Sequence, residues 1–410
     1  MPINNDCVLP VPDQDALIQS EKLVAHIKDL MSEQGGVIGF DKYMNSALYK
    51  PGLGYYSAGS RKFGPEGDFV TAPEISALFS QCLAYQCAQV LNKLGSGIIL
   101  ELGAGTGVMA RDLLLELEKL NSLPEEYYIL EISADLKQRQ QVLLNESIPH
   151  LMERLVWLES LPEKALTGLI LANEVLDALP VQRFIKTSGI FKEMKVGSAR
   201  ISHPLSGGEK CGHDNNDFTW LDDDAEPELL KALEQIENEL SVPFPQGYIS
   251  EINMNLGTWL SAIEQVLERG VMLFIDYGYT ASEYYHPERT EGSLLCHYRH
   301  RVHADPFYYP GLQDITTSVN FTAVAECADT LGLNVNGYTS QTYFLFGCGL
   351  DNLVADMNSL DIKSQTNTSQ QVKTLTMSEE MGERFKVMAL TKDYDHTLMG
   401  FSVLDQRIRL

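Results

Sequence analysis

The feature that most constrains the fold is an apolar strand that runs directly into a glycine-rich turn, over residues 98–107 (IILELGAGTG). Glycine lets the backbone turn tightly and lets a ligand approach without meeting a Cβ atom. We expect a helix to begin directly after the turn, because the amides at its N-terminus would then point at the ligand. This order is typical of the first unit of a parallel α/β sheet with a ligand site at the turn.

The chain on both sides of this turn alternates between apolar strands and amphipathic helices, which predicts a doubly wound parallel sheet. We expect helices at residues 20–34, 75–94, 109–120, 134–145, 227–240, 256–269 and 322–331, and strands at 98–100, 127–131, 155–158, 168–172, 271–275 and 343–346. The remaining segments are expected to be an ordered loop at 43–73, a solvated excursion at 203–228, a long aromatic loop up to 315, a mobile loop at 361–374 and a closing helix at 379–390.

Polar side chains follow several of the predicted strands. Glu131 ends one strand, Asn173, Glu174 and Asp177 follow another, and Asp276 ends a third. In open α/β sheets the ligand crevice lies outside the carboxyl ends of the strands. The sequence therefore predicts an acidic site at this edge.

Two kinds of cofactor fit a glycine turn of this type. A dinucleotide fingerprint needs Gly-x-Gly-x-x-Gly, but here the third glycine, Gly107, comes one residue early. The Glu-x-Gly-x-Gly-x-Gly form instead resembles the first motif of the S-adenosylmethionine methyltransferases. A carboxylate at Glu131 can accept hydrogen bonds from both ribose hydroxyls of an adenosyl group, which suits either cofactor. An NAD-dependent oxidoreductase is thus an alternative that the third glycine disfavours.

Several further motifs, in order along most of the chain, resemble the MidA family of S-adenosylmethionine-dependent methyltransferases. They are residues 67–76 (GDFVTAPEIS), 101–107 (ELGAGTG), 131–133 (EIS), 173–180 (NEVLDALP), 276–278 (DYG), 298–301 (YRHR) and 310–316 (PGLQDIT). That family includes the mitochondrial complex I assembly-factor arginine methyltransferase.

The resemblance implies an α/β fold, a Rossmann-like class I methyltransferase core with an added smaller α+β lobe. The expected division has an N-terminal helix and ordered loop packing on the core (1–90), the core itself (91–186 and 245–280), the accessory lobe (187–244 and 281–320) and a C-terminal completion of the core (321–410). The expected activity is methyl transfer from S-adenosyl-L-methionine to an arginine of a protein partner, with a respiratory complex I subunit as a candidate. The alternative is a non-catalytic assembly factor or chaperone that retains the cofactor-binding fold.

A guanidinium is always charged and pairs with carboxylates, so acidic residues at the sheet edge suit this reaction. We expect Glu74, Glu174 and Asp177 to be catalytic, holding the guanidinium while one of them accepts the proton. The residues expected to bind the cofactor are Thr71, Pro73, Glu101, Gly103, Ala104, Gly105, Gly107, Glu131, Asn173 and Asp276. The segment 65–74 is expected to be a loop that contacts the cofactor.

The composition of the chain disfavours some classes of partner and indicates a location in the cell. The chain has 31 Lys and Arg against 56 Asp and Glu, a net charge of -25, which disfavours binding to a phosphate backbone. The seven cysteines form no zinc-ligand pattern, and the irregularly spaced histidines near residue 300 are not expected to bind a metal. No apolar run is long enough to cross a membrane, and the N-terminus lacks a cationic start. We therefore expect a cytoplasmic protein that uses neither nucleic acid nor membrane insertion; a homodimer is left open.

Overall fold

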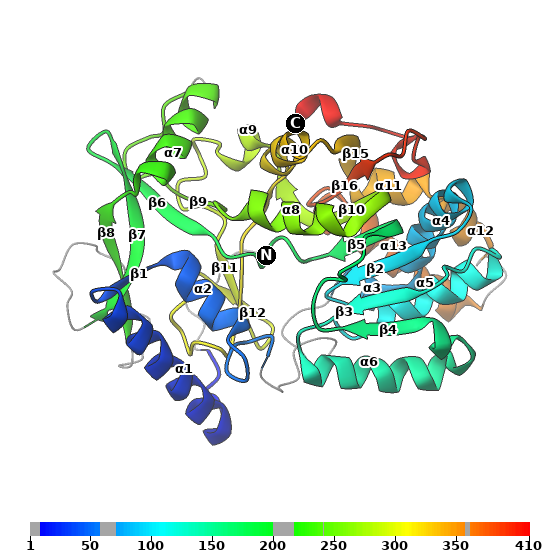
Figure 1. Cartoon of the computed structure of the whole chain (residues 1–410), viewed down its shortest axis with the longest axis horizontal. Coiled ribbons are helices and arrows are strands. Elements are labelled where there is room, and N and C mark those ends of the chain that lie inside the picture. Colours follow the sequence, from blue (N-terminus) through cyan, green and yellow to red (C-terminus); the bar gives the residue numbers. More distant parts are fainter. Residues whose placement is uncertain (1–8, 58–70, 200–216, 241, 357–360) are drawn as a thin grey trace. The chain divides into compact units, whose positions relative to one another are not determined.

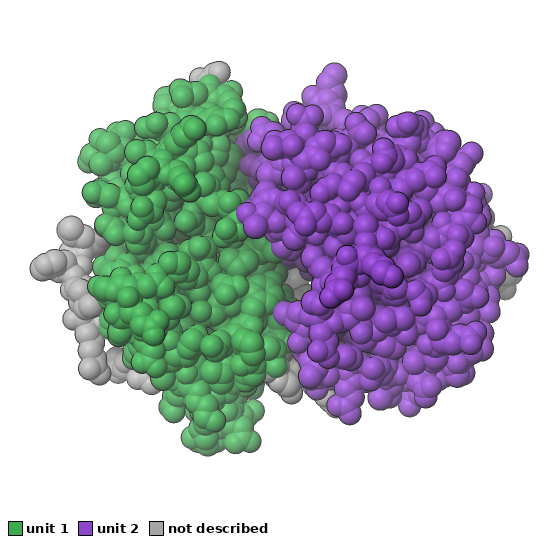
Figure 2. All heavy atoms as spheres, in the orientation of Figure 1, with its two compact units in different colours: residues 1–60, 178–255, 282–318 green, residues 61–177, 256–281, 319–410 purple. Residues whose placement is uncertain are grey.

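The computed structural model describes residues 9–57, 71–199, 217–240, 242–356 and 361–410. The chain divides into two compact units, which Figure 2 distinguishes by colour. Unit 1 comprises residues 1–60, 178–255 and 282–318, and unit 2 comprises residues 61–177, 256–281 and 319–410. Each unit is thus built from three separate segments of the chain.

Unit 2 is organised around an eight-stranded sheet (Figure 1). Its strand order is β15-β16-β10-β5-β2-β3-β4, and β14 pairs with β10. The strands β4, β3, β2, β5 and β10 are mutually parallel, whereas β16 runs antiparallel to both β10 and β15. The strands are β2 (Ile98–Leu102), β3 (Tyr127–Leu130), β4 (Leu155–Leu158), β5 (Leu166–Asn173), β10 (Leu267–Tyr279), β14 (Val319–Asn320), β15 (Asn334–Ser340) and β16 (Phe385–Lys392).

Helices bury both faces of this sheet, as a parallel sheet requires. Along β10, Val271 and Leu273 belong to the large apolar cluster that includes α4 and α5, whereas Phe274 packs against Trp259 of α8 at 5.9 Å between ring centroids. The helices of this unit are α3 (Ala72–Ile75), α4 (Ala77–Leu94), α5 (Val108–Lys119), α6 (Ala134–Ser147), α8 (Leu256–Val266), α10 (Phe321–Thr330), α11 (Gln341–Gly347), α12 (Leu350–Asp356) and α13 (Ile362–Thr376), with 3-10 turns η1 (Pro149–Arg154), η4 (Met399–Phe401) and η5 (Arg407–Arg409).

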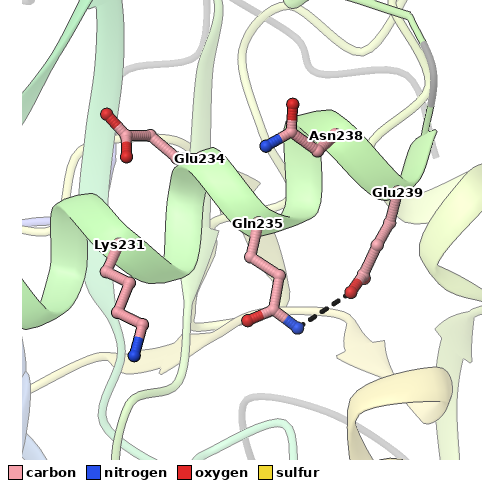
Figure 3. A pocket seen from close by; sticks show the side chains of 5 residues that line it. All are labelled: Lys231, Glu234, Gln235, Asn238 and Glu239. Carbon is pink, nitrogen blue, oxygen red and sulfur yellow. Dashed lines mark hydrogen bonds between the residues drawn. The ribbon is translucent and has the colours of Figure 1, made fainter.

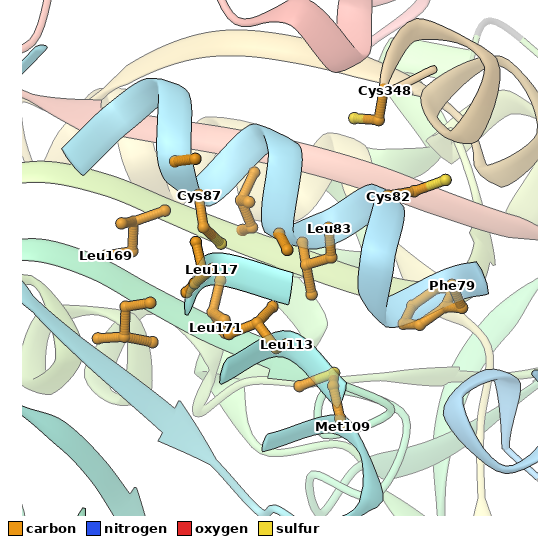
Figure 4. Packing of buried hydrophobic residues seen from close by; sticks show 14 of the residues in the cluster. Phe79, Cys82, Leu83, Cys87, Met109, Leu113, Leu117, Leu169, Leu171 and Cys348 are labelled. Atoms are coloured by element: carbon orange, nitrogen blue, oxygen red, sulfur yellow. The ribbon is translucent and has the colours of Figure 1, made fainter. Parts of the chain in front are cut away.

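The apolar cluster on one face of the sheet is closely packed (Figure 4). Leu83 and Cys87 of α4 pack in one cluster with Leu113 and Leu117 of α5 and with Leu171 of β5, and α4 contacts both α5 and β5. Burial raises the pKa of the Cys87 thiol, which keeps it protonated. The cysteines of this cluster therefore act as small apolar side chains.

Unit 1 has two smaller sheets. The first is five-stranded, with the order β1-β7-β6-β9 and β8 paired with β7, and the second is three-stranded, with the order β12-β11-β13. The elements are α1 (Gln14–Glu33), β1 (Val37–Gly39), α2 (Phe40–Tyr49), β6 (Gln182–Thr187), β7 (Ile190–Ser198), β8 (Phe218–Asp224), α7 (Pro227–Leu240), β9 (Ile249–Ile252), β11 (Leu295–Tyr298), β12 (Arg301–His303) and β13 (Asp314–Thr316); α9 (Ala281–Tyr284) lies at the unit boundary.

The observed division differs from the expected one at the N-terminus. Residues 1–90 were expected to pack on the core as one segment, but β1 pairs with β7 in antiparallel register, so residues 1–60 belong to unit 1. The pairing of Ile38 with Val196 joins segments more than 150 residues apart in the chain. No local sequence signal reports such a pairing.

The strands and helices expected between residues 98 and 275 are confirmed, but the strands β6, β7, β8 and β9 within that range were not predicted. Three elements near the C-terminus were predicted wrongly. The expected strand 343–346 lies inside α11, where Phe344 and Leu345 are buried; a short apolar run does not distinguish a buried helix from a strand. The expected mobile loop 361–374 is α13, because Asp361 caps it by accepting hydrogen bonds from the backbone N–H groups of Lys363 and Ser364 at 2.9 and 3.1 Å. The second half of the expected helix 379–390 is β16 and the first half is a turn, since pairing with β10 and β15 outweighs helical periodicity.

Segments expected to be irregular also contain regular structure. Residues 43–49 continue α2, the aromatic region before residue 315 contains the three-stranded sheet, and part of the expected excursion 203–228 is β8. The rest of that excursion up to residue 216, and the portion of the motif 67–76 before residue 71, lie outside the described residues.

Candidate active site

The carboxyl ends of four strands of unit 2 meet at one edge of the sheet. Leu102 of β2 is in register with Leu130 of β3 and with Ala172 of β5. Ile275 of β10 is in register with Asn173, the last residue of β5. The structure therefore brings the predicted polar residues to one edge, although Asp276 lies within β10, which continues to Tyr279, and does not end that strand.

The glycine turn leaves β2 at this edge and leads into α5. Gly103, Gly105 and Gly107 have φ angles of 66°, 54° and 85°, in the left-handed region that favours glycine. A Cβ atom on Gly103 would lie 3.5 Å from Val175 Cγ2, so the turn passes close to the segment after β5. Ala104, between two of the glycines, is buried. This open backbone is what a cofactor needs in order to approach the N-terminus of α5 closely.

Glu131 follows β3 and its carboxylate is held from two sides. Oε1 accepts a hydrogen bond from the backbone N–H of Ser133 at 2.9 Å, and Oε2 accepts one from Gln140 Nε2 at 2.9 Å. The residue is buried, while the next residue, Ile132, is 58% exposed. A fixed carboxylate at the end of this strand fits the recognition of ribose hydroxyls.

Glu74 reaches the glycine turn from α3. Its carboxylate accepts a hydrogen bond from the hydroxyl of Thr106, which lies in the turn. Thr71 occupies the N-cap position of α3, and Pro73 is buried in its first turn. A carboxylate from a segment about 30 residues earlier is thus fixed beside the cofactor turn.

Glu174 and Asp177 lie on the segment that follows β5, and Asp276 holds this segment. Asp276 Oδ2 accepts hydrogen bonds from the backbone N–H groups of Val175 (3.1 Å), Leu176 (2.9 Å) and Asp177 (3.2 Å). Three N–H groups that converge on one oxygen fix the backbone of the segment. The structure therefore suggests that Asp276 positions the other acidic residues.

The same segment contains strained backbone and closely spaced charge. Glu174 has a φ angle of 54°, which is unfavourable for a residue with a side chain. Burial raises the pKa of Asp276 well above its ordinary value, and the charges of Asp177 and Glu174 raise it further, whereas backbone hydrogen bonds lower it. Strain and concentrated charge of this kind are typical of functional sites.

Asn173 has a buried side-chain oxygen that indicates a ligand site. Its Nδ2 donates a hydrogen bond to Glu174 Oε1 at 3.3 Å, but its buried Oδ1 has no hydrogen-bond partner in the described part of the chain. A buried acceptor without a partner is costly unless a ligand or water donates to it. The edge therefore fits a bound group that carries hydrogen-bond donors, as an adenosylated amino acid does.

Glu101 lies within β2. Its side chain is 1% exposed, and Oε2 accepts a hydrogen bond from the Tyr127 hydroxyl at 2.8 Å. Burial raises the pKa of Glu101 to about 7, the Tyr127 hydrogen bond offsets part of this rise, and the charge of Glu131 adds to it. The carboxylate thus joins β2 to β3 beneath the turn.

Sequence reasoning missed three polar residues of this edge. Thr106 binds Glu74, Gln140 binds Glu131, and Trp157 donates a hydrogen bond from Nε1 to Gln140 Oε1 at 3.0 Å. Thr106 lies within the glycine motif and could have been flagged there. Gln140 carried a weaker signal, as a polar residue at a buried position of α6.

Two of the histidines near residue 300, His297 and His303, are half-buried. No group of three or more metal-ligating side chains occurs among the residues that the structure describes. Burial lowers the pKa values of His297 and His303 to about 4, so both rings are neutral near pH 7.

An open hollow elsewhere contains none of the predicted site residues. It lies on α7 and is lined by Lys231, Glu234, Gln235, Asn238 and Glu239; Gln235 Nε2 donates a hydrogen bond to Glu239 Oε1 at 2.8 Å (Figure 3).

Within the described ranges, no helix is both long and apolar enough to cross a membrane.

The doubly wound sheet, the glycine turn and the acidic edge together define a Rossmann-like class I methyltransferase. A family model described as "Putative S-adenosyl-L-methionine-dependent methyltransferase" matches residues 82–339, which is more than half of the chain. The chain therefore belongs to this family, and S-adenosyl-L-methionine is its cofactor. The family is the MidA-like one that the motifs resemble.

Two solved structures are similar over nearly the whole chain. One is a candidate methyl transferase from Burkholderia thailandensis bound to S-adenosyl-homocysteine, with a TM-score of 0.89 and 39% identity, covering 98% of this chain and 100% of that one. The second, a native structure from the same organism, has a TM-score of 0.87 and 38% identity, with the same coverage. The bound product in the first structure argues against the dinucleotide alternative.

Curated relatives are more distant in sequence. The Drosophila melanogaster "Protein arginine methyltransferase NDUFAF7 homolog, mitochondrial" is 29% identical over 388 residues, covering 87% of this chain and 82% of the relative. The Homo sapiens "Protein arginine methyltransferase NDUFAF7, mitochondrial" is 25% identical over 387 residues, covering 87% of this chain and 80% of the relative. Both names place these relatives in mitochondria. They contradict the cytoplasmic location expected from the N-terminal residues, because such a short segment is a weak guide to location.

Proposed function

We propose that this methyltransferase transfers the methyl group to an arginine side chain of a protein partner. The observation that carries the proposal is the pair of carboxylates on the segment after β5, Glu174 and Asp177, held beside the glycine turn by Asp276. The names of the curated relatives support the same acceptor. The family resemblance suggests a subunit of respiratory complex I as the protein partner.

Carboxylates suit an arginine acceptor for an electrostatic reason. A guanidinium has a pKa above about 12 and so remains charged, and its planar fork of N–H groups pairs with carboxylates in two-pronged geometry. Glu174 and Asp177 would hold the guanidinium and localise its charge away from the nitrogen that reacts. Glu74, fixed to the turn by Thr106, supplies a third carboxylate at the cofactor.

The cofactor supplies a methyl group already activated by its sulfonium sulfur, so the chain has to orient the acceptor nitrogen and exclude water. As the nitrogen–carbon bond forms and the sulfur–carbon bond breaks, a proton leaves the guanidinium. One of Glu74, Glu174 and Asp177 accepts that proton. The products are then a methylarginine that keeps its positive charge, S-adenosyl-homocysteine with a neutral sulfur, and a protonated carboxyl group on the chain.

The proposed cofactor residues fall into two groups. Gly103, Ala104, Gly105, Gly107, Glu131 and Asn173 would contact the cofactor through the turn and the strand ends, with Thr71 and Pro73 approaching from α3. Glu101 and Asp276 would act by positioning, because their carboxylates bind Tyr127 and the backbone after β5.

The test uses the full chain, S-adenosyl-L-methionine with a labelled methyl group, and protein extract from cells that lack this chain. We expect label in methylarginine after acid hydrolysis, and a loss of about a hundredfold in Glu174→Gln. The matched control is Glu159→Gln, an exposed carboxylate that follows β4. Label on another amino acid would refute the arginine acceptor; no label despite cofactor binding would favour a non-catalytic assembly factor.

A further inference from the structure

Gln140 is a buried amide on a helix that otherwise presents mainly charged and polar residues to solvent. Its side chain is 0% exposed, and only Leu136 and Leu144 share that status as buried residues of α6. Burial of an amide is unfavourable unless its donors and acceptor are all engaged. The partners of Gln140 therefore indicate what it does.

The amide nitrogen of Gln140 joins two parts of the cofactor edge. Nε2 donates one hydrogen bond to the backbone oxygen of Gly105 at 2.8 Å and another to Glu131 Oε2 at 2.9 Å. Both donors of the NH2 group are thereby used. One side chain links the glycine turn after β2 to the carboxylate after β3.

Trp157 fixes which way the amide faces. Its indole Nε1, which only donates, lies 3.0 Å from Gln140 Oε1. An amide with this neighbour keeps its oxygen toward Trp157 and its nitrogen toward Gly105 and Glu131. Trp157 belongs to β4, so the orientation is set by a third strand of the sheet.

Gln140 also packs directly on the glycine turn. A Cβ atom on Gly107 would lie 3.2 Å from Gln140 Cγ and 3.4 Å from its Cα. The side chain thus lies across the turn at its last glycine. Both hydrogen bonding and packing hold the turn and the carboxylate at a fixed separation.

We propose that Gln140 is a positioning residue that, with Trp157 behind it, sets the Glu131 carboxylate for the ribose hydroxyls of the cofactor. The inference rests on the proposed function, in which the Glu131 carboxylate accepts hydrogen bonds from the ribose hydroxyls of the cofactor. The proposal adds that the affinity for the ribose depends on contacts from Trp157 of β4, through Gln140 of α6, to Glu131 and the glycine turn. A role limited to filling the core would not distinguish one part of the ligand from another.

The test compares two ligands by isothermal titration, S-adenosyl-L-homocysteine and its analogue that lacks the ribose 2′-hydroxyl. In Gln140→Leu we expect the Kd for S-adenosyl-L-homocysteine to rise about tenfold and the Kd for the analogue, which keeps only the 3′-hydroxyl for Glu131, to rise less, by about threefold. The matched control is Gln138→Leu, the same change at an exposed position of α6. The ratio of the two affinities is a property of the folded protein, so partial unfolding does not alter it.

Trp157→Phe provides a second variant that keeps an aromatic ring but removes the indole N–H. We expect the same ligand preference to weaken by about threefold. Equal losses for both ligands, or no loss for either, would overturn the inference. If Glu131→Ala leaves both affinities unchanged, the ribose role of Glu131 fails; if Glu131→Ala weakens binding and Gln140→Leu does not, only the positioning role fails.

Discussion

Tyr127 donates a hydrogen bond from its hydroxyl to Glu101 Oε2 at 2.8 Å, inside the apolar cluster on one face of the main sheet. The two residues lie on the neighbouring strands β3 and β2. Burial of this carboxylate beneath the cofactor turn raises its pKa to about 7. An acid of this kind makes the stability of the fold depend on pH.

The sign of that dependence follows from proton linkage. An ordinary Glu in the unfolded chain has a pKa near 4.5, so between pH 4.5 and pH 7 the folded protein binds the proton more tightly. The contribution of Glu101 to stability is fully present below pH 4.5 and is lost as pH rises through about 7, a difference of about 3 kcal/mol. We expect Glu101→Gln to remove this fall in the free energy of unfolding, which urea unfolding at pH 5 and pH 8 measures in the parent and the variant. A variant whose stability changes with pH as the parent's does would contradict the assignment.

Gly107→Ala should impair cofactor binding. The residue has a φ angle of 85°, and a Cβ atom there would meet Gln140 at 3.2 Å. Gly95 has a similar φ angle of 90° with nothing within 4 Å, so Gly95→Ala is a matched control for backbone strain alone. We expect each change to cost about 1–2 kcal/mol of stability. Only Gly107→Ala should also weaken S-adenosyl-L-homocysteine binding in titration, by about tenfold or more. If Gly107→Ala and Gly95→Ala bind this ligand equally well, the turn tolerates the contact between the new Cβ atom and Gln140.

Asp276→Asn should loosen the segment that carries Glu174 and Asp177. An amide has one acceptor oxygen, so its NH2 group would face either the three N–H groups that now donate to Oδ2 or the Tyr277 N–H that now donates to Oδ1 at 2.9 Å. We expect a loss of about 2 kcal/mol in stability and a fall in kcat larger than the change in KM for the cofactor. Asp361→Asn, at the exposed cap of α13, is the control and should cost less than about 1 kcal/mol. Unchanged kcat would exclude the positioning role.

Glu174→Gly should raise the stability of the chain and lower its activity. The φ angle of 54° strains Glu174, so glycine should raise the free energy of unfolding by about 1 kcal/mol. Loss of the carboxylate should lower methyl transfer by about a hundredfold. Asp393, exposed and with a φ angle of 49°, offers a control in which Asp393→Gly stabilises the chain and leaves activity intact. Methyl transfer that survives Glu174→Gly would remove Glu174 from the catalytic set.

The sequence predicts the sheet well wherever local pattern and long-range packing agree. The strands β2, β3, β4, β5 and β10 are apolar runs between glycine-rich or polar turns, and a buried parallel sheet needs that pattern. It fails at β16, where the order of residues suits a helix but pairing with two neighbours decides the outcome. It fails also at β1, whose partner β7 is remote in the chain.

The candidate site shows the same division. Residues at strand ends, such as Asn173 at the end of β5 and Glu131 directly after β3, could be located from the sequence because the strand ends of a parallel sheet share one edge. Gln140 and Trp157 could not, since their importance depends on side-chain contacts between α6 and β4. Asp276 was located correctly at the edge, but its bonding to backbone N–H groups appears only in three dimensions.

The most direct test of the account is isothermal titration of S-adenosyl-L-homocysteine into the full chain and into Glu131→Ala. Glu146→Ala, an exposed glutamate of α6, is the control. We expect saturable binding at one site in the parent and the control, and at least tenfold weaker binding in Glu131→Ala, because the carboxylate after β3 is the proposed ribose acceptor. Binding that is unchanged in Glu131→Ala would contradict the placement of the cofactor at this edge.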